Sequence, residues 1–411
     1  MGTSWIRKKL GEICHKIKAG GTPSRKVLEY WNGDIPFVKI EDISSTNLYL
    51  GDTQEKISQK GLENSNAWIL PPNSVLFSIY GSIGEVAINK IPVATNQAIL
   101  GLIPKNEIIN HKFLAYSLKA FGKYLISYYI QSTQKNLTLE IVKSFEIPLP
   151  PLPIQQKIVK ILDTIQSAVD IQEKIIEKTK ELKKSLMAEL FKYGAPSFRK
   201  GRKLKKTEIG EIPEDWEVVR LGDVCNTATG GTPSRSKEEY FNGNILWVKS
   251  GEIDDNIIFD TEEKITEEGL NKSSIRIFPK NTLLIAMYGA TAGKTALLGR
   301  EASINQAVCA ILPRSQKINI HFLRYFIIQF REKLLSERYG GAQPNLNQFI
   351  IQNFKISLPP LPEQQEIAEI LQTIDQKIEI EKRKKELYEE LFKTMLNKIM
   401  NQEIDVEKIE V

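Results

Sequence analysis

The sequence predicts a mixed α+β fold made of two similar globular domains in tandem, each followed by a long helix. We expect the two helices to pair as an antiparallel coiled coil with pseudo-twofold symmetry. Three observations lead to this prediction. The chain repeats itself once, short β-rich runs alternate with turn signals in each copy, and a helix with a coiled-coil pattern ends each copy. The 411 residues exceed what one ordinary domain needs.

The repeat consists of short motifs that recur in the same order about 210 residues apart. They are GGTPSR (20–25 and 230–235), VK (38–39 and 248–249), YG (80–81 and 288–289) and NQA (96–98 and 305–307). PLPPLP at 148–153 is answered by LPPLP at 358–362, and a Gln-Gln pair follows each. Solenoid repeats recur every ~20–50 residues, so this longer period indicates two whole domains.

The motifs also set the expected boundaries. We predict a first globular domain at 1–152, a long helix at 153–193, a basic linker at 194–211, a second globular domain at 212–361, a second long helix at 362–403 and a tail at 404–411. Within the domains, residues 74–80 and 282–288 are predicted to be strands and residues 111–127 and 320–336 to be helical. The Asn-Gly pairs at 32–33 and 242–243 are expected to form turns.

Both long helices carry a coiled-coil seam. Pro153 and Pro362 suit a first helical turn, and apolar residues then recur at spacings of three and four. In the first helix the expected seam includes Ile158, Leu162, Ile165, Val169, Ile175, Ile176, Leu182, Leu186 and Leu190. Polar residues interrupt the seams at Gln172, and at Glu381 and Lys385, where they can fix register and partner. The breaks fall at matching places, which disfavours two unrelated amphipathic helices.

Composition sets only broad limits on function. The net charge of +6 allows a polyanionic partner but does not by itself indicate one. Cys14, Cys225 and Cys309 form no CxxC pair, which favours a reducing, cytoplasmic location. No signal peptide and no run of ~18 apolar residues is present, so no membrane partner is expected.

The predicted architecture suits a split DNA target. A helix of ~38 residues is ~57 Å long, whereas one turn of B-DNA is ~34–36 Å. Two domains held apart by such a rod could each read a few base pairs and leave those between them unread. Because the domains are similar but not identical, the two halves of the target need not be palindromic.

The whole chain resembles the specificity subunit of type I restriction–modification systems. The segments that carry the resemblance are 149–158 and 358–367, the opening of the second domain at 212–224 (IPEDWEVVRLGDV), and GGTP in both copies. The resemblance implies two target recognition domains, each binding one half of a split double-stranded DNA site. It also implies that the long helices act as a spacer and dock two modification subunits.

Further partners and cofactors follow from the same resemblance. The modification subunits would bind S-adenosylmethionine and methylate adenine at N6, and a restriction subunit would translocate DNA with ATP and cut it with Mg²⁺. The specificity subunit itself would be non-catalytic and would hold no cofactor or metal. A self-dimer of the free chain through its exposed seam is left open.

Several segments imitate an active site. Residues 289–295 (GATAGKT) approach a P-loop, but only three residues separate the glycines, and the first copy has Glu85 after its second glycine. DTEEK at 260–264 resembles a nuclease motif, yet the first copy reads DTQEK at 52–56. His15, His111 and His321 do not correspond between the copies and show no metal-ligand spacing. No methyltransferase motif of the Asp/Asn-Pro-Pro-Tyr/Phe type is present.

The duplication sorts candidate DNA contacts into two groups. Residues identical in both copies cannot make the domains read different bases, so we assign them to shared tasks such as phosphate contacts. These candidates are Arg25, Lys39, Tyr80, Arg235, Lys249 and Tyr288. Residues that differ beside them are candidates for base readout: Lys26, Ser44, Ser45, Gln134 and Lys135 in the first copy, and Lys237, Asp254, Asn256, Gln343 and Asn347 in the second.

Each candidate has a plainer alternative. A surface cation is as good an explanation for each phosphate candidate, ordinary loop polarity is the better one for any single base-reading candidate, and Tyr80 and Tyr288 could be core residues. The basic linker, with Arg199, Lys200, Arg202, Lys203, Lys205 and Lys206, is a solvated loop or a strap along phosphates. Two other functions stay open for the chain, a nucleotide-binding enzyme that uses residues 289–295 and a two-lobed scaffold that binds only protein.

Overall fold

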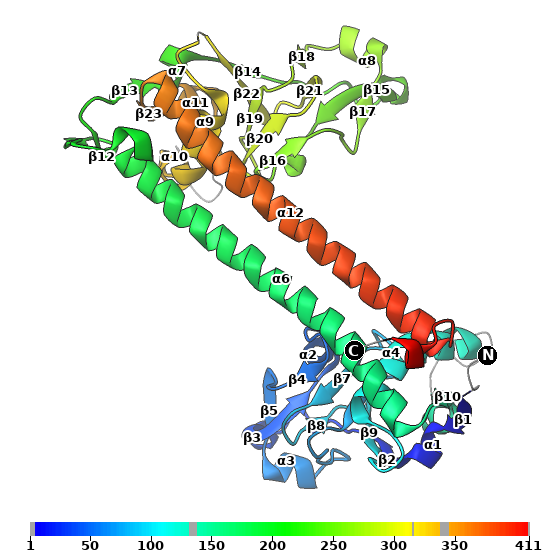
Figure 1. Ribbon diagram of the computed structural model, residues 1–411. Helices are drawn as coiled ribbons and strands as arrows, with labels where there is room; N and C mark the ends of the chain where they lie inside the picture. The colour runs from blue at the N-terminus through cyan, green and yellow to red at the C-terminus, as the bar shows by residue number, and fades with distance from the viewer. Residues whose placement is uncertain (1–4, 131–137, 315, 338–344, 410–411) are drawn as a thin grey trace. The chain divides into compact units, whose positions relative to one another are not determined.

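The computed structural model describes residues 5–130, 138–314, 316–337 and 345–409. The chain forms two compact units (Figure 1). The first unit consists of Met1–Glu173 and Arg383–Val411, and the second of Lys174–Lys382. Each unit therefore contains one globular domain and a part of both long helices.

The globular domain of the first unit is a mixed fold around a five-stranded sheet. This sheet has the order β2-β9-β6-β7-β4, with β2 at Cys14–Ala19, β4 at Tyr49–Leu50, β6 at Val75–Ser78, β7 at Val86–Asn89 and β9 at Ile99–Pro104. A second sheet has the order β5-β3-β8, with β3 at Trp31–Val38, β5 at Glu55–Ile57 and β8 at Ala94–Thr95. β1 (Ile6–Lys9) pairs with β10 (Glu146–Leu149). Phe77 of β6 and Phe113 of the helix α4 (His111–Ile130) are fully buried in one core.

Short and long helices complete this domain. They are α1 (Leu10–Ile13), η1 (Leu28–Tyr30), α2 (Ile40–Ser44), α3 (Gln59–Glu63), α4 (His111–Ile130) and α5 (Leu139–Ser144). The predicted strand at 74–80 and the predicted helix at 111–127 are both present, as β6 and α4.

The second domain repeats this topology. Its five-stranded sheet has the order β14-β22-β19-β20-β16, formed by Cys225–Thr229, Val308–Pro313, Leu283–Ala286, Thr295–Leu298 and Asn256–Ile258. A four-stranded sheet has the order β17-β15-β21-β18, formed by Lys264–Ile265, Phe241–Val248, Ala302–Ile304 and Ile277–Phe278. β13 (Glu217–Arg220) pairs with β23 (Lys355–Leu358), as β1 does with β10. The predicted tandem of mixed domains is thus confirmed.

The helices of the second domain also match those of the first, with one break. They are α7 (Leu221–Val224), η3 (Glu238–Tyr240), η4 (Ser250–Glu252), α8 (Glu267–Asn271), α9 (Ile320–Gln329), α10 (Arg331–Ser336) and α11 (Gln348–Asn353). The predicted helix at 320–336 is interrupted at Phe330, whose φ of −105° and ψ of 23° are not helical. Within the second unit, the chain between α6 and the second domain forms η2 (Pro196–Phe198) and a hairpin of β11 (Leu204–Thr207) and β12 (Gly210–Pro213).

The Asn-Gly pairs do not form turns between strands, so that prediction is wrong. They lie inside β3 and β15, at places where the register with the neighbouring strand shifts. Asn32 and Asn242 adopt positive φ angles of 59° and 60°, which asparagine tolerates. A side chain at Gly33 would lie 2.4 Å from Ser58 Cα. The pair therefore forms a bulge that re-aims a long strand.

The long helices are α6 (Leu152–Tyr193) and α12 (Leu361–Met400), drawn in green and orange-red in Figure 1. In the first unit, Leu162 near the start of α6 shares a core with Ile399 near the end of α12. In the second unit, Leu190 near the end of α6 shares a core with Ile367 near the start of α12. Opposite ends of the two helices meet in each unit, so the helices pair antiparallel as predicted. No helix in the described ranges is both long and apolar enough to cross a bilayer.

The seam differs from its predicted course in the middle of α6. Gln172 and Thr179 are each only 8% exposed, whereas Leu182 is 53% exposed. The predicted break at Gln172 is therefore in the seam, but the seam continues through Thr179 instead of Leu182. Heptad spacing runs through Val169, Gln172, Ile176 and Thr179, and the more apolar Leu182 falls outside it. In α12, Glu381 is also 8% exposed, and Lys385 bonds to Glu173 at 3.1 Å.

A buried glutamine fixes each long helix to its own domain. Gln155 accepts a hydrogen bond from Asn110 N (2.8 Å) and donates to Ile108 O (3.0 Å) and Pro150 O (2.8 Å). Gln364 makes the same three bonds in the second unit, with Asn319 N (2.8 Å), Lys317 O (3.0 Å) and Pro359 O (2.8 Å). These bonds explain the first glutamine of each Gln-Gln pair.

Candidate nucleic-acid interface

Four motifs that the two copies share meet at one place in the first unit. The turn at 96–98 (NQA) lies at the centre of this place. Three backbone hydrogen bonds connect the other motifs to this turn or to Thr95, the residue before it. They are Gly21 N to Thr95 O (2.9 Å), Asn96 N to Val38 O (3.2 Å) and Ile79 N to Ala98 O (2.8 Å). The residues that follow these anchored positions therefore gather around the turn. We call Thr22, Lys39, Tyr80 and Gln97 the shared surface of the first unit.

The second unit builds an equivalent surface. Its three backbone bonds join Gly231 N to Ile304 O (3.1 Å), Asn305 N to Val248 O (2.9 Å) and Met287 N to Ala307 O (2.8 Å). The shared surface of the second unit is Thr232, Lys249, Tyr288 and Gln306. In both units the threonine and the glutamine are exposed, and the tyrosine is 39% exposed. Tyr80 and Tyr288 are therefore surface residues and not core residues.

The double glycine at the start of GGTPSR permits this convergence. A Cβ atom on Gly20 would lie 2.0 Å from Thr95 O, and one on Gly230 would lie 1.8 Å from Ile304 O. No side chain fits at such distances, so only glycine lets the two backbones approach. The glycines therefore have a structural role in forming the surface.

A threonine–glutamine pair stands at the centre of each shared surface. Thr22 Oγ1 donates a hydrogen bond to Gln97 Oε1 (2.5 Å), and Thr232 donates to Gln306 in the same way. This bond orients the carboxamide and leaves its N–H groups without an acceptor in the part of the chain that the structure describes. Neither glutamine was among the candidate contacts, although the identity of NQA in both copies was a signal that could have selected them.

The shared cations are held by carboxylates. In the first unit, Glu55 bonds to Arg25 at 2.7 Å and to Lys39 at 2.9 Å. The Arg25 guanidinium also stacks on Trp31, with its carbon 3.7 Å from the ring centroid. This arrangement holds both cations in place. The spacing of these residues in the sequence does not predict it.

The second unit repeats this cluster with one more acid. Arg235 bonds to Glu263 at 2.6 Å, and Lys249 lies 3.0 Å from both Glu262 and Glu263. Arg235 lies over Phe241, 4.6 Å from the ring centroid. Glu262 and Glu263 of the supposed nuclease motif at 260–264 are thus partners of the shared cations, while Asp260 pairs with Lys264 at 2.9 Å.

These contacts shift the pKa values of the acids. Burial by itself raises the pKa of Glu55. The hydrogen bonds that Glu55 accepts from Lys39 and Arg25 lower it by more, so the pKa lies below its ordinary value. Hydrogen bonds from Arg235 and Lys249 lower the pKa of Glu263. Each carboxylate is therefore ionised at neutral pH and offsets part of the positive charge. The phosphate contacts assigned to Arg25, Lys39, Arg235 and Lys249 stay predictions.

The candidates for base readout in the first unit occupy two exposed turns. Lys26 is exposed directly after Arg25, and Ser44 and Ser45 are exposed at the end of α2. Ser45 donates to Asp42 O at 3.0 Å. Gln134 and Lys135 lie outside the described residues.

The candidates in the second unit are more often engaged in local contacts. Lys237 is exposed and lies 3.5 Å from Glu239, while Asp254 bonds to Lys294 at 2.5 Å. Asn256 donates to Glu252 O at 3.1 Å, and Asn347 caps α11 by accepting from Ile350 N at 2.8 Å. Gln343 lies outside the described residues.

The loop that resembles a P-loop is a shared structural turn. Gly289 and Gly293 have φ angles of 79° and 78°, and Gly81 and Gly84 have 67° and 94° in the first unit. Three amides in the second half of the loop bond to backbone carbonyls: Ala292 N to Gly289 O (3.1 Å), Gly293 N to Ala286 O of β19 (2.8 Å) and Lys294 N to Thr291 O (2.9 Å). A P-loop needs such amides free for phosphate. Among the described residues no group of three or more His, Cys, Asp or Glu side chains could hold a metal ion.

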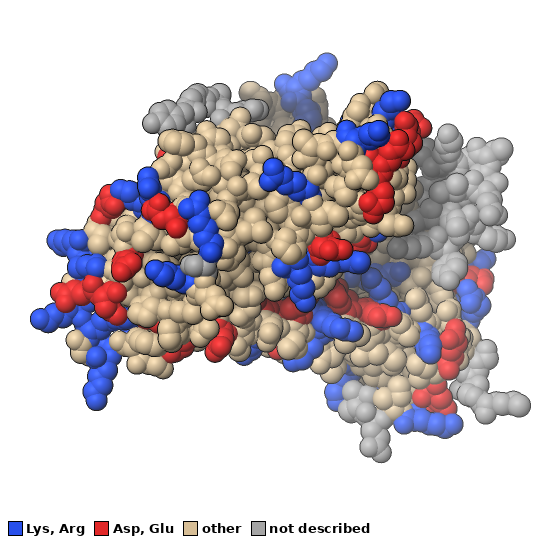
Figure 2. Space-filling model, turned by 90° about the horizontal axis from the view of Figure 1, so that it is seen from above, with Lys and Arg blue, Asp and Glu red and all other residues tan. Residues whose placement is uncertain are grey.

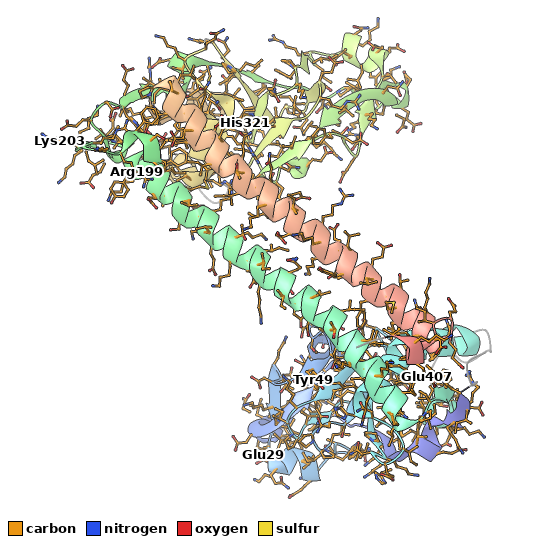
Figure 3. All side chains as sticks on the ribbon, in the orientation of Figure 1. Glu29, Tyr49, Arg199, Lys203, His321 and Glu407 are labelled. Atoms are coloured by element: carbon orange, nitrogen blue, oxygen red, sulfur yellow. The ribbon has the colours of Figure 1, made fainter. Side chains whose placement is uncertain are left out.

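Two arginines of the basic linker are used inside the second unit. Arg202 forms a bidentate pair with Glu363, which is fully buried and also accepts from Trp216 Nε1 at 2.9 Å. Arg199 bonds to Glu189 and to Gly194 O. Lys203 is exposed near Arg199 at the end of α6 (Figure 3). These contacts favour a structural linker over a strap along phosphates.

Charge is mixed on the face of the molecule that Figure 2 shows. On the face shown in Figure 2, Lys and Arg side chains stand singly or beside Asp and Glu. A strongly basic surface would favour DNA of any sequence. The mixed charge on this face is consistent with a protein whose binding depends on a few specific contacts and not on a general attraction to polyanions.

Comparisons with known proteins define the class. The family model for the type I restriction modification DNA specificity domain matches twice, at residues 3–181 and 213–390. The chain is 30% identical to the type I restriction enzyme MjaVIII specificity subunit of Methanocaldococcus jannaschii, over 98% of this chain and 94% of the relative. It is 29% identical to the EcoR124I/EcoR124II specificity subunit of Escherichia coli, over 57% of this chain and 56% of the relative.

Solved structures agree on the fold. A chain from a study of complex assembly and conformational transition of the type I R-M system superimposes with a TM-score of 0.67 at 18% identity, covering 97% of this chain and 98% of that chain. The HsdS subunit from Thermoanaerobacter tengcongensis gives a TM-score of 0.51 at 18% identity, covering 98% of both chains. These likenesses show that the chain shares the fold of those proteins. This chain belongs to the family of type I restriction–modification specificity subunits.

Proposed function

We propose that this chain selects the DNA target of a type I restriction–modification complex by binding a bipartite duplex site, one half with each domain. The observation that carries the proposal is that two domains of one topology present the same shared surface but differ beside it. Identical residues suit the sugar–phosphate backbone, which is the same in every sequence, and differing residues suit base edges.

The shared surface would hold the backbone through neutral donors as well as cations. Phosphate oxygens accept hydrogen bonds from Gln, Thr and Tyr side chains as well as from Lys and Arg. Gln97 and Gln306 have oriented carboxamides, and Tyr80 and Tyr288 lie beside them. Glu55 and Glu263 offset part of the positive charge of the local cations. The shared contacts would therefore position the domain on the DNA backbone while adding little nonspecific electrostatic affinity.

We also infer that the paired helices set the gap and dock the other subunits. At ~1.5 Å per residue, the 42 residues of α6 extend ~63 Å, which exceeds one turn of B-DNA. Two modification subunits would bring S-adenosylmethionine and methylate adenine, and a restriction subunit would bring ATP and Mg²⁺. The chain itself would be non-catalytic. The engaged amides of the loop at 289–295 disfavour a nucleotide-binding enzyme.

Methylome sequencing of cells that express the chain with its modification subunits tests this proposal. We expect N6-methyladenine in a motif of two short specified parts separated by a fixed gap. Exchanging residues 1–150 for those of another specificity subunit should change one part of the motif alone. A contiguous motif, or no N6-methyladenine, would contradict the proposal. Failure of the assembled complex to bind any duplex would favour the scaffold that binds only protein.

A further inference from the structure

An exposed leucine stands at the tip of a turn in the first unit. Leu28, in η1, is 84% exposed, more than any other large apolar side chain in the described residues. It follows Arg25, one of the shared cations, by three residues in the sequence, in the same hydrogen-bonded segment. Glu29, the next residue, is labelled in Figure 3 at the end of the domain that carries β3 and α3. A leucine this exposed contributes nothing to the core of its own domain.

The turn that carries Leu28 is rigidly held. Within it, Val27 N bonds to Ser24 O (3.3 Å) and Tyr30 N bonds to Val27 O (3.1 Å). From outside, Ser58 Oγ donates to Glu29 O (2.6 Å), and Trp31 Nε1 donates to Ser24 O (3.2 Å). The exposure of Leu28 is therefore a property of a fixed turn.

The second unit has the same turn with a different tip. Its bonds are Lys237 N to Ser234 O (3.1 Å), Tyr240 N to Lys237 O (3.1 Å) and Thr266 Oγ1 to Glu239 O (2.9 Å). The residue at the position of Leu28 is Glu238, which is also exposed. One scaffold thus presents an apolar side chain in one unit and a hydrogen-bond acceptor in the other.

We propose that Leu28 and Glu238 are specificity-determining residues, each for one base pair of its own half-site. In the major groove, an apolar side chain recognises the methyl group of thymine, and a glutamate accepts a hydrogen bond from the N4 amino group of cytosine. Leu28 therefore selects thymine, and Glu238 selects cytosine. The proposal rests on the proposed function, because it assumes that each domain reads one half of a split site.

Exchanging the two tips tests the proposal. The variants Leu28→Glu and Glu238→Leu are assembled with the modification subunits, and each complex selects its targets from a library of random duplexes. We expect Leu28→Glu to change the relative preference for one base over another by about tenfold or more at one position of the first half-site. The preferences in the second half-site should stay unchanged. Glu238→Leu should do the converse. Ile6→Glu, at another exposed apolar residue of the first unit (61% exposed), should leave both halves unchanged.

Each alternative result would contradict one specific claim. If the unchanged chain selects no split site, the proposed function fails. If it selects a split site and both exchanged variants select the same one, only the present proposal fails. A fall in affinity that is equal for all sequences would make these residues backbone contacts. If Leu28→Glu prevents co-purification with the modification subunits, the leucine is a protein contact and the proposal is likewise wrong.

Discussion

Replacing Gln155 with alanine should weaken the attachment of α6 to its own domain far more than the same change at Gln156. Gln155 is fully buried and makes three hydrogen bonds to backbone groups, at 2.8, 3.0 and 2.8 Å. The neighbouring Gln156 is exposed. The two residues have the same chemistry and the same helix, so they form a matched pair.

The size of the effect follows from the groups left behind. A buried hydrogen bond contributes ~1 kcal/mol net, and a buried backbone group without a partner costs ~1–3 kcal/mol. Removing the Gln155 carboxamide affects three such groups, so we expect unit 1 to lose ~3 kcal/mol of stability. Gln156→Ala should change stability by less than ~0.5 kcal/mol, as exposed substitutions do.

Hydrogen exchange measured peptide by peptide in the full chain separates these expectations. A loss of ~3 kcal/mol corresponds to roughly a hundredfold faster exchange in the segments of the first unit that open together. The increase should be largest at the start of α6 and around Asn110, whose amide loses its acceptor. Equal, small changes in both variants would refute the assignment of Gln155 as the residue that fixes the helix to the domain.

Three further predictions concern other parts of the molecule. Glu363→Ala should destabilise the second unit by ~3 kcal/mol in urea unfolding followed by tryptophan fluorescence, because the buried N–H groups of Trp216 Nε1 and Ala195 lose their acceptor while Arg202 keeps only its pair with Asp215; a loss below ~1 kcal/mol would contradict this. The lowered pKa of Glu55 means that its ion pairs stabilise the first unit above the unfolded pKa of ~4.3 and cease to do so as pH falls through the lower folded pKa. The variant Glu55→Gln should therefore flatten the dependence of unfolding on pH between about 3 and 5, and an unchanged profile would refute the role of the pairs. Gln97→Ala and Gln306→Ala should each weaken binding to every duplex alike in titrations with the assembled complex, and a changed sequence preference would count against a backbone contact.

The repeat made most of the fold predictable. Motifs in the same order gave two domains, and the alternation of β-rich runs with a helical segment gave their mixed class. The Asn-Gly pairs misled because a bulge and a turn need the same residue types, and only the contact of Gly33 with Ser58 distinguishes them. The seam of α6 was misplaced because Leu182 is more apolar than Thr179, although heptad spacing selects Thr179.

The candidate site was predictable in kind but not in its contacts. The motifs that the two copies share meet in space through the backbone bonds around residues 96–98, while their contacts with DNA stay predictions. The sequence could not reveal that Arg25 and Lys39 share Glu55, since this contact joins residues far apart in the chain. The burial of Glu363 has no counterpart in the first copy, where Ile154 takes the equivalent place. A contact that only one copy makes does not appear when the sequences of the two copies are compared.

The construction of the first unit affects how the chain is made in the cell. Its core includes Leu396, Ile399 and Val406, which are synthesised long after the first domain. At ~5–20 residues per second, roughly ten to forty seconds separate the emergence of Glu173 from that of Arg383, where the last segment of this unit begins. During this time the first domain exposes apolar surface that the segment from Arg383 onward covers in the folded unit. Chains that terminate before Arg383 would therefore keep this surface exposed, and chaperones and proteases would encounter it.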